Sequence, residues 1–149
     1  MKSIQINIPE GFEVDKFDTK TGEITFKEKP KNVIERINSL HDILDYHGKT
    51  MEAINEVFKN VPEHLKYQYI AELGCEILNE GWIPNWDDRS QLKYFIWFKM
   101  GSSGFRYHDY AYWSADSLVG SRLCFKKLES AKHLATIIND VFEKFMIIK

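Results

Sequence analysis

The chain has 149 residues, of which 44% are hydrophobic, and its formal net charge is −2. A charge so close to zero argues against strong nonspecific attraction to nucleic acid or to anionic membranes. The first residues, MKSIQINIPEGF, alternate polar and apolar types, and no later segment reaches the roughly 18 apolar residues of a membrane-spanning helix, so we expect neither a signal peptide nor a membrane span.

Strands are predicted at the N-terminus. The alternation from Ile4 to Ile8 predicts a short strand that ends at Pro9-Glu10-Gly11. A β-hairpin is predicted next, with Gly22 able to supply the positive φ that its turn needs. Its two strands carry the apolar residues Phe12, Val14, Phe17, Ile24 and Phe26.

Helical periodicity follows in the middle of the chain. The first helix is predicted over roughly residues 31–46, a shorter second one follows an N-cap at Thr50, and a third runs from Pro62 to its terminator Gly81. Their apolar stripes consist of Val33, Ile37, Leu40, Ile43 and Leu44; of Met51, Ile54, Val57 and Phe58; and of Leu65, Tyr69, Leu73, Ile77 and Leu78.

The period changes from 3.6 to 2 at Lys93. The runs KYFIWFKM and GFRYHDYAYW flank a four-residue connection at 101–104 and predict a second hairpin. We predict a third strand around residues 121–125, followed by one amphipathic helix over 128–145.

These elements predict a single α+β domain over residues 1–149. It consists of an N-terminal β-hairpin element (1–30), a helical middle (31–81), and a three-stranded antiparallel sheet packed by a final helix (82–149). We expect Cys75 and Cys124 to be buried free thiols, as is usual in a reducing compartment, with a disulfide as the alternative. A cytoplasmic location is therefore predicted.

Aromatic residues and positive charge concentrate in the same block of sequence. Twelve of the 21 aromatic residues lie between Trp82 and Phe125. From Lys93 to Lys127 there are six basic and two acidic residues, whereas from Val33 to Glu80 there are four basic and nine acidic ones. The acidic helices and the basic sheet could also pair between copies of the chain, which predicts self-association as one option.

Strict alternation in the second strand of this hairpin places Arg106, His108, Tyr110 and Tyr112 on one face, which Lys93 or Lys99 could border from the neighbouring strand. The opposite face would carry the residues expected to face the core: Phe105, Tyr107, Asp109, Ala111 and Trp113. A basic and aromatic face suits a protein partner or the stacked bases of a single-stranded nucleic acid. The competing interpretation is that Tyr110 and Tyr112 pack beneath a helix or the N-terminal hairpin.

Three further residues are candidates for binding. Trp82 and Trp86 flank a proline and would be interface anchors if exposed, or would cap the core where helix passes into sheet. Arg122 could join Arg106 in an anion-binding face, or could pair with an acidic helix residue such as Glu72 or Glu76.

Signals for chemistry are weak in this sequence. No cofactor and no metal site are predicted, because the five histidines fall in separate predicted elements without the converging spacing of metal ligands. A catalytic pocket would most plausibly involve His108, Asp109 and Arg106. No catalytic residue is assigned.

The segments INIPEGFEVDK, LNEGWIPNWDD with KYFIWFKM, and VGSRLCFK before an Ala-rich helix together resemble a group of small proteins encoded by phages and prophages of Bacteroidales. The resemblance implies a cytoplasmic protein of mobile-element origin, and it brings no catalytic residues with it. We therefore predict a non-enzymatic binding protein whose aromatic and basic sheet face binds a protein partner. The alternatives are a single-stranded nucleic-acid binding module and a small enzyme.

Overall fold

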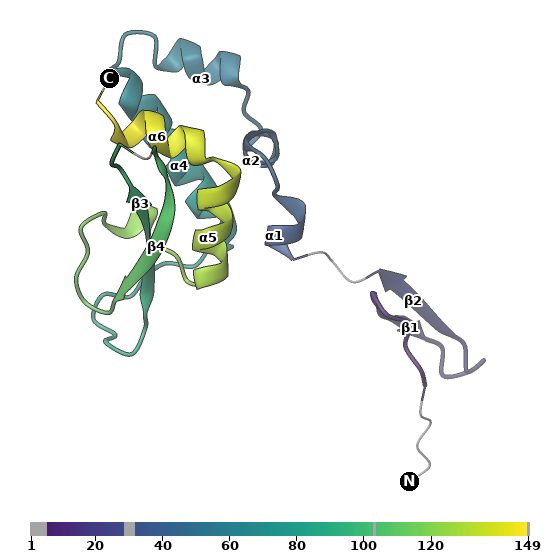
Figure 1. The fold of residues 1–149 in the computed structure, drawn as a ribbon. Helices are drawn as coiled ribbons and strands as arrows, with labels where there is room; N and C mark the ends of the chain where they lie inside the picture. The colour runs from purple at the N-terminus through teal and green to yellow at the C-terminus, as the bar shows by residue number, and fades with distance from the viewer. Residues whose placement is uncertain (1–5, 29–31, 103, 149) are drawn as a thin grey trace. The chain divides into compact units, whose positions relative to one another are not determined.

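The computed structural model describes residues 6–28, 32–102 and 104–148, and the chain divides into two compact units, Met1–Asn32 and Val33–Lys149. Figure 1 follows the elements in order. The described residues form six α-helices, one short 3-10 helix and two antiparallel sheets of two strands each. This confirms the predicted α+β class.

The first unit is a β-hairpin of β1 (Phe12–Phe17) and β2 (Ile24–Glu28). Gly22 in its turn has φ +75°, as predicted, and Asp18 Oδ1 accepts hydrogen bonds from the backbone N–H groups of Lys20 and Thr21. These two hydrogen bonds lower the pKa of Asp18. The expected strand at residues 4–8 is not formed where it can be checked, since residues 6–8 lie outside any strand and residues 4 and 5 lie outside the described residues.

The predicted helix over 31–46 is wrong in one respect, because two short helices replace it. They are α1 (Val33–Arg36) and α2 (Leu40–Tyr46), and residue 31 lies outside the described part. Ser39 is extended and caps α2 by accepting from the Asp42 N–H, while the Asp42 carboxylate accepts from the Asn38 N–H. This reciprocal capping box starts a new helix at a point where the apolar periodicity alone continues.

The next two helices follow the sequence closely. Thr50 caps α3 (Met51–Val57) by accepting from the Ala53 N–H at 3.2 Å, which confirms the predicted N-cap. The long helix α4 (Glu63–Asn79) begins directly after Pro62 and ends in two left-handed residues, Glu80 and Gly81.

The second sheet has two strands, β3 (Lys93–Lys99) and β4 (Arg106–Trp113), and not the three predicted. Residues Ser121–Leu123 form the 3-10 helix η1, and only Phe125 bridges to β3, exchanging two hydrogen bonds with Tyr94. The ladder does not extend because η1 ends at Leu123 and Lys127 is already the N-cap of α5, so the residues on either side of Phe125 that would bond to β3 are in other conformations. The Asn79 amide lies at the edge of Phe125 that points away from β3. It donates to the Cys124 carbonyl and accepts from the Lys126 N–H, the backbone groups on either side of Phe125.

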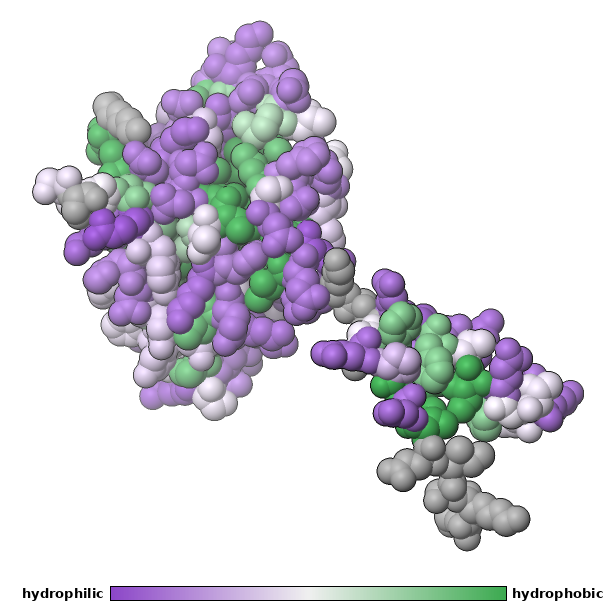
Figure 2. All heavy atoms as spheres, turned by 45° about the vertical axis from the view of Figure 1, so that its right-hand side comes forward, coloured by the Kyte–Doolittle hydropathy of each residue, from purple (hydrophilic) through white to green (hydrophobic). Residues whose placement is uncertain are grey.

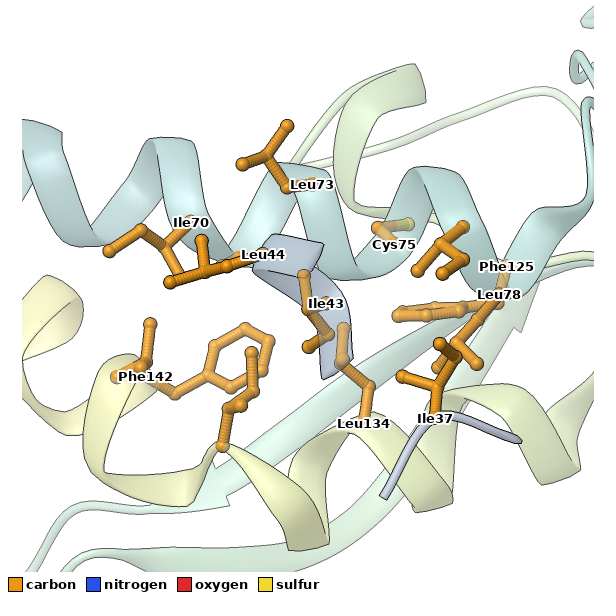
Figure 3. Packing of buried hydrophobic residues seen from close by; sticks show 14 of the residues in the cluster. Ile37, Ile43, Leu44, Ile70, Leu73, Cys75, Leu78, Phe125, Leu134 and Phe142 are labelled. Atoms are coloured by element: carbon orange, nitrogen blue, oxygen red, sulfur yellow. The ribbon is translucent and has the colours of Figure 1, made fainter. Parts of the chain in front are cut away.

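The expected closing helix is likewise divided. It consists of α5 (Leu128–Ile137) and α6 (Asn139–Met146), which are separated at Ile138. The core of this unit lies between the sheet and the helices α2, α4, α5 and α6. Figure 3 shows Ile43 of α2 and Leu134 of α5 converging next to α4, where Gly74 leaves room for them.

Candidate functional site

A β-bulge in β4 decides which of the predicted site residues share a face. Trp97 pairs with Asp109, but the next residue of β3, Phe98, pairs with Tyr107, so the register skips His108. Side chains of directly paired residues point to the same side of a sheet. The inserted residue therefore reverses the alternation between the two halves of β4.

Tyr110 and Tyr112 consequently lie on the inner face, which the helices cover. The ring of Tyr94, whose side chain packs on the core, is 6.1 Å from each of them, and the Lys132 ammonium of α5 lies 5.4 Å from the Tyr110 ring. Tyr110 is half-buried, whereas Tyr112 at the end of the strand is 56% exposed. The predicted common face of Arg106, His108, Tyr110 and Tyr112 is wrong.

The opposite side of the sheet, which we call the outer face, carries Trp97 and Lys99 from β3 and Arg106, Asp109 and Trp113 from β4. Trp97 is 55% exposed and Trp113 is 48% exposed. The prediction that Asp109 and Trp113 face the core is wrong, again because of the bulge. Lys99 and Arg106 face each other directly across the two strands. An aromatic and basic surface therefore exists, which keeps the predicted Lys99 and Arg106 but has Trp97 and Trp113 in place of Tyr110 and Tyr112.

A buried lysine, Lys93, lies at one end of the outer face. Lys93 is 0% exposed, and its ammonium donates to the carbonyls of Asn85, Asp88, Gln91 and Ser114 at 2.5–3.2 Å. These bonds fix the loop before β3 to the end of β4. Because an ammonium has only three N–H groups, four acceptors satisfy it fully.

The same loop contains Trp86. Its ring lies 5.4 Å from the Lys93 ammonium, and its indole N–H donates to Ser121 Oγ at 2.8 Å. In the loop, Asp88 accepts from both the backbone N–H and the hydroxyl of Ser90, and these hydrogen bonds lower the pKa of Asp88. Trp86 is therefore engaged within the unit, as the core-capping alternative expected.

Trp82 and Arg122 lie apart from the outer face, in a groove of about 420 Å³ beside α4. The groove is also lined by Glu72, Ile83 and Ser121. The Arg122 guanidinium is 3.9 Å from the Glu72 carboxylate, so the ion-pair alternative for Arg122 is confirmed and the anion-binding face shared with Arg106 is not formed.

Two buried thiols lie behind this groove. Cys75 donates to the Cys124 carbonyl, and the Asn79 amide contacts both the Cys75 sulfur and that carbonyl. Burial raises the pKa of Cys75 well above its ordinary value and raises the pKa of Cys124 to about 11. Both cysteines are free, as predicted, and neither has the lowered pKa of a nucleophile.

The predicted catalytic residues His108, Asp109 and Arg106 do not line the groove beside α4. They are also absent from the linings of three other grooves of the described residues, those lined by Met51, by Phe142 and by His64. Within the same described part, no three His, Cys, Asp or Glu residues converge as metal ligands would, and no helix is long and apolar enough to cross a membrane.

The sequence interpretation missed Trp97 and placed Trp113 on the wrong side. The usable signal was the alternation in KYFIWFKM, which puts Trp97 on the same side as Lys99. No protein-family model matches the chain, and comparisons with curated proteins and with solved structures find no match. The resemblance to phage-encoded proteins therefore stays a prediction.

Proposed function

We propose that this chain is a non-enzymatic binding protein of the cytoplasm, and that its outer face binds an acidic segment of a partner protein. The observation that carries the proposal is the exposure of Trp97 and Trp113 on a face that also presents Lys99 and Arg106. The free, buried state of both cysteines fits the reducing cytoplasm.

Exposed tryptophans are costly unless something covers them. Fully burying a large apolar side chain contributes about 1.5–3 kcal/mol, and tryptophan and arginine are the residues that most often dominate binding energy. The surrounding structure is rigid at one end of the face, where Lys93 fixes the loop to the sheet. A partner would therefore meet a preorganised surface, which lowers the entropic cost of binding.

The charges of the outer face indicate the chemistry of the partner. Lys99 and Arg106 are directly paired across the strands and give this part of the face a positive charge, which favours a carboxylate on the partner. Asp109 lies opposite Trp97 on the same face and would repel a continuous run of phosphates. An apolar segment with one or two carboxylates matches this pattern better than a polyanion does.

Single-stranded nucleic acid is the second candidate, because two exposed indoles beside two cations resemble a stacking platform. The two candidates differ in salt dependence and in the need for base stacking. Affinity for a nucleic acid falls steeply with salt, whereas binding to an apolar peptide with few charges changes modestly.

The proposal is tested by selecting peptides from a random display library on the full chain. Selected peptides should combine apolar residues with Asp or Glu, and Trp97→Ala should weaken their binding by about 30-fold, the loss of a hot spot of roughly 2 kcal/mol. Tyr112→Ala is the matched control, since Tyr112 is an equally exposed aromatic residue of the same sheet on the inner face.

Peptides that bind the Trp97→Ala variant as well as the wild type would contradict the proposal. Fluorescent oligo-dT is titrated in parallel at low and moderate salt. Tight, salt-sensitive binding that is lost in Trp97→Ala would assign the outer face to nucleic acid instead.

A further inference from the structure

The groove beside α4 has no part in the proposed function, yet it brings charged and apolar side chains together in one hollow. On the face of the Val33–Lys149 unit that Figure 2 shows, apolar residues are scattered among hydrophilic ones. Scattered apolar residues of this kind are ordinary on a protein surface. The groove is different, because its volume of about 420 Å³ lies within the range of small-molecule sites, roughly 300–1,000 Å³.

One part of the lining is a stripe along α4. Tyr69, Glu72 and Glu76 follow one another at spacings of three and four residues, so they lie on the same side of the helix, and all three line the groove. Glu72 is half-buried and Glu76 is exposed. The groove also reaches Asn79 and Gly81 at the C-terminal end of α4, where the helix dipole adds a partial negative charge. This part of the lining therefore favours a cation.

A second part of the lining is apolar and aromatic. It consists of Trp82, Ile83 and Pro84, in the segment that follows α4. Ile83 is 83% exposed and offers apolar surface to a ligand. An aromatic ring attracts a cation placed over its face, and the planar guanidinium stacks on such rings. Charge and aromatic surface in one groove therefore suit a guanidinium that is carried on an apolar stem.

The chain's own Arg122 indicates the same kind of cation. Its guanidinium Nη1 lies 3.9 Å from Glu72 Oε2, which is beyond hydrogen-bond range, and the Arg122 side chain is 79% exposed. Within the described residues, Glu76 forms no ion pair. An exposed ion pair of this kind contributes little, so a free cation can replace Arg122. An anion beside Arg122 would instead be repelled by the two carboxylates.

We propose that the groove beside α4 binds a small organic cation, a guanidinium group on a short apolar stem. The guanidinium binds the carboxylates of Glu72 and Glu76 in place of Arg122, and the stem packs on Trp82 and Ile83. A planar guanidinium matches a carboxylate with two parallel N–H groups, whereas an ammonium is a point charge without that geometry. The site is separate from the outer face and stands or falls independently of the proposed function.

Butylguanidinium is the probe, and butylurea is its neutral control, because the two have nearly the same planar shape and differ in charge. Each is titrated into the full chain at low salt while the backbone amide signals are followed by NMR. Butylguanidinium should shift the amides of the groove with a Kd of about 1 mM, the scale for a ligand of this size. Butylurea should bind at least about 10-fold more weakly.

Two substitutions should change the affinity in opposite directions. Arg122→Gln removes the competing guanidinium and should tighten binding about 3-fold, whereas Glu76→Gln removes a carboxylate and should weaken it about 5-fold. Arg89→Gln and Glu56→Gln are the matched controls, since they remove the same charges at exposed positions outside the groove. Both controls should leave the affinity unchanged.

A blocked arginine, titrated in the same way, carries the same group on a peptide backbone. A site for a free cation should bind it no more tightly than butylguanidinium, and binding tighter by about 10-fold or more would overturn the proposal in favour of an arginine of a partner protein. Equal binding of butylguanidinium and butylurea, weaker binding by Arg122→Gln, or full affinity in Glu76→Gln would each overturn it as well.

Discussion

Lys93→Met removes a buried ammonium while keeping most of the apolar stem. In the wild type the ammonium donates to four carbonyls from two segments, the loop at 85–91 and Ser114 after β4. Methionine offers no donor, so these carbonyls lose their shared partner. The loop should therefore detach from the end of the sheet.

The magnitude follows from two opposing contributions. Hydrogen bonds to a charged group contribute about 1.5–3 kcal/mol each, which for three N–H groups gives roughly 4.5–9 kcal/mol. Removing the ammonium also recovers its desolvation penalty, which is several kcal/mol, and the loop carbonyls can turn to water. We expect a net loss of about 3 kcal/mol in the free energy of unfolding, or a fall in Tm of roughly 10–15 °C.

The assay is urea denaturation followed by tryptophan fluorescence, which also reports on Trp86 beside the ammonium. Lys99→Met makes the same chemical change on the same strand at an exposed position and should alter stability by less than about 0.5 kcal/mol. Equal stability of Lys93→Met and the wild type would refute the reasoning, and so would equal losses in the two variants.

Three further predictions concern the core. Gly74→Ala should lower the free energy of unfolding, measured by urea denaturation, by about 1 kcal/mol. The new Cβ would meet Leu134 Cδ1 at 2.6 Å, and this overpacking outweighs the gain in helix propensity. A variant at least as stable as the wild type would contradict this prediction. The thiols of Cys75 and Cys124 should resist iodoacetamide at pH 8 until the chain unfolds. Burial raises the pKa of Cys124 in the folded chain to about 11, so the thiol of the unfolded chain ionises at lower pH. The free energy of unfolding should therefore fall as the pH rises from the ordinary pKa of a thiol through about 11. The Cys124→Ala variant should lose less stability over this pH range, and an identical decline in the variant and the wild type would count against the argument.

Much of the helical architecture could be predicted from sequence, because apolar periodicity and local capping residues act over short distances. Thr50 and Gly81 marked helix ends correctly. The third strand could not be excluded in this way. Its ladder is limited to Phe125 because η1 precedes it and α5 follows it, and the edge that points away from β3 is bonded by Asn79, which lies 45 residues before Cys124. A long-range hydrogen bond of this kind leaves no local pattern.

The character of the candidate surface was predicted correctly, but several of its residues were not. The sequence indicated an aromatic and basic face between Lys93 and Trp113, and the outer face has that character. Lys99 and Arg106 belong to it, whereas Trp82 and Arg122 line the groove beside α4. Arg122 could not be placed from sequence, since its position depends on η1 replacing a strand.

The two bulges, in β1 between Val14 and Lys16 and in β4 at His108, explain why one hairpin could be interpreted from sequence more easily than the other. In β1 the apolar residues are at positions 12, 14 and 17 and most of their neighbours are charged. The change in their spacing from two residues to three therefore indicates in the sequence itself that one residue is inserted. In β4 the residues on both sides of His108 are large and amphipathic, and either register gives a plausible face. A bulge can therefore be detected where the two sides of a strand differ in polarity, and it is hidden where both are aromatic. The position of Trp113 on the outer face follows directly from a bulge that the sequence could not show.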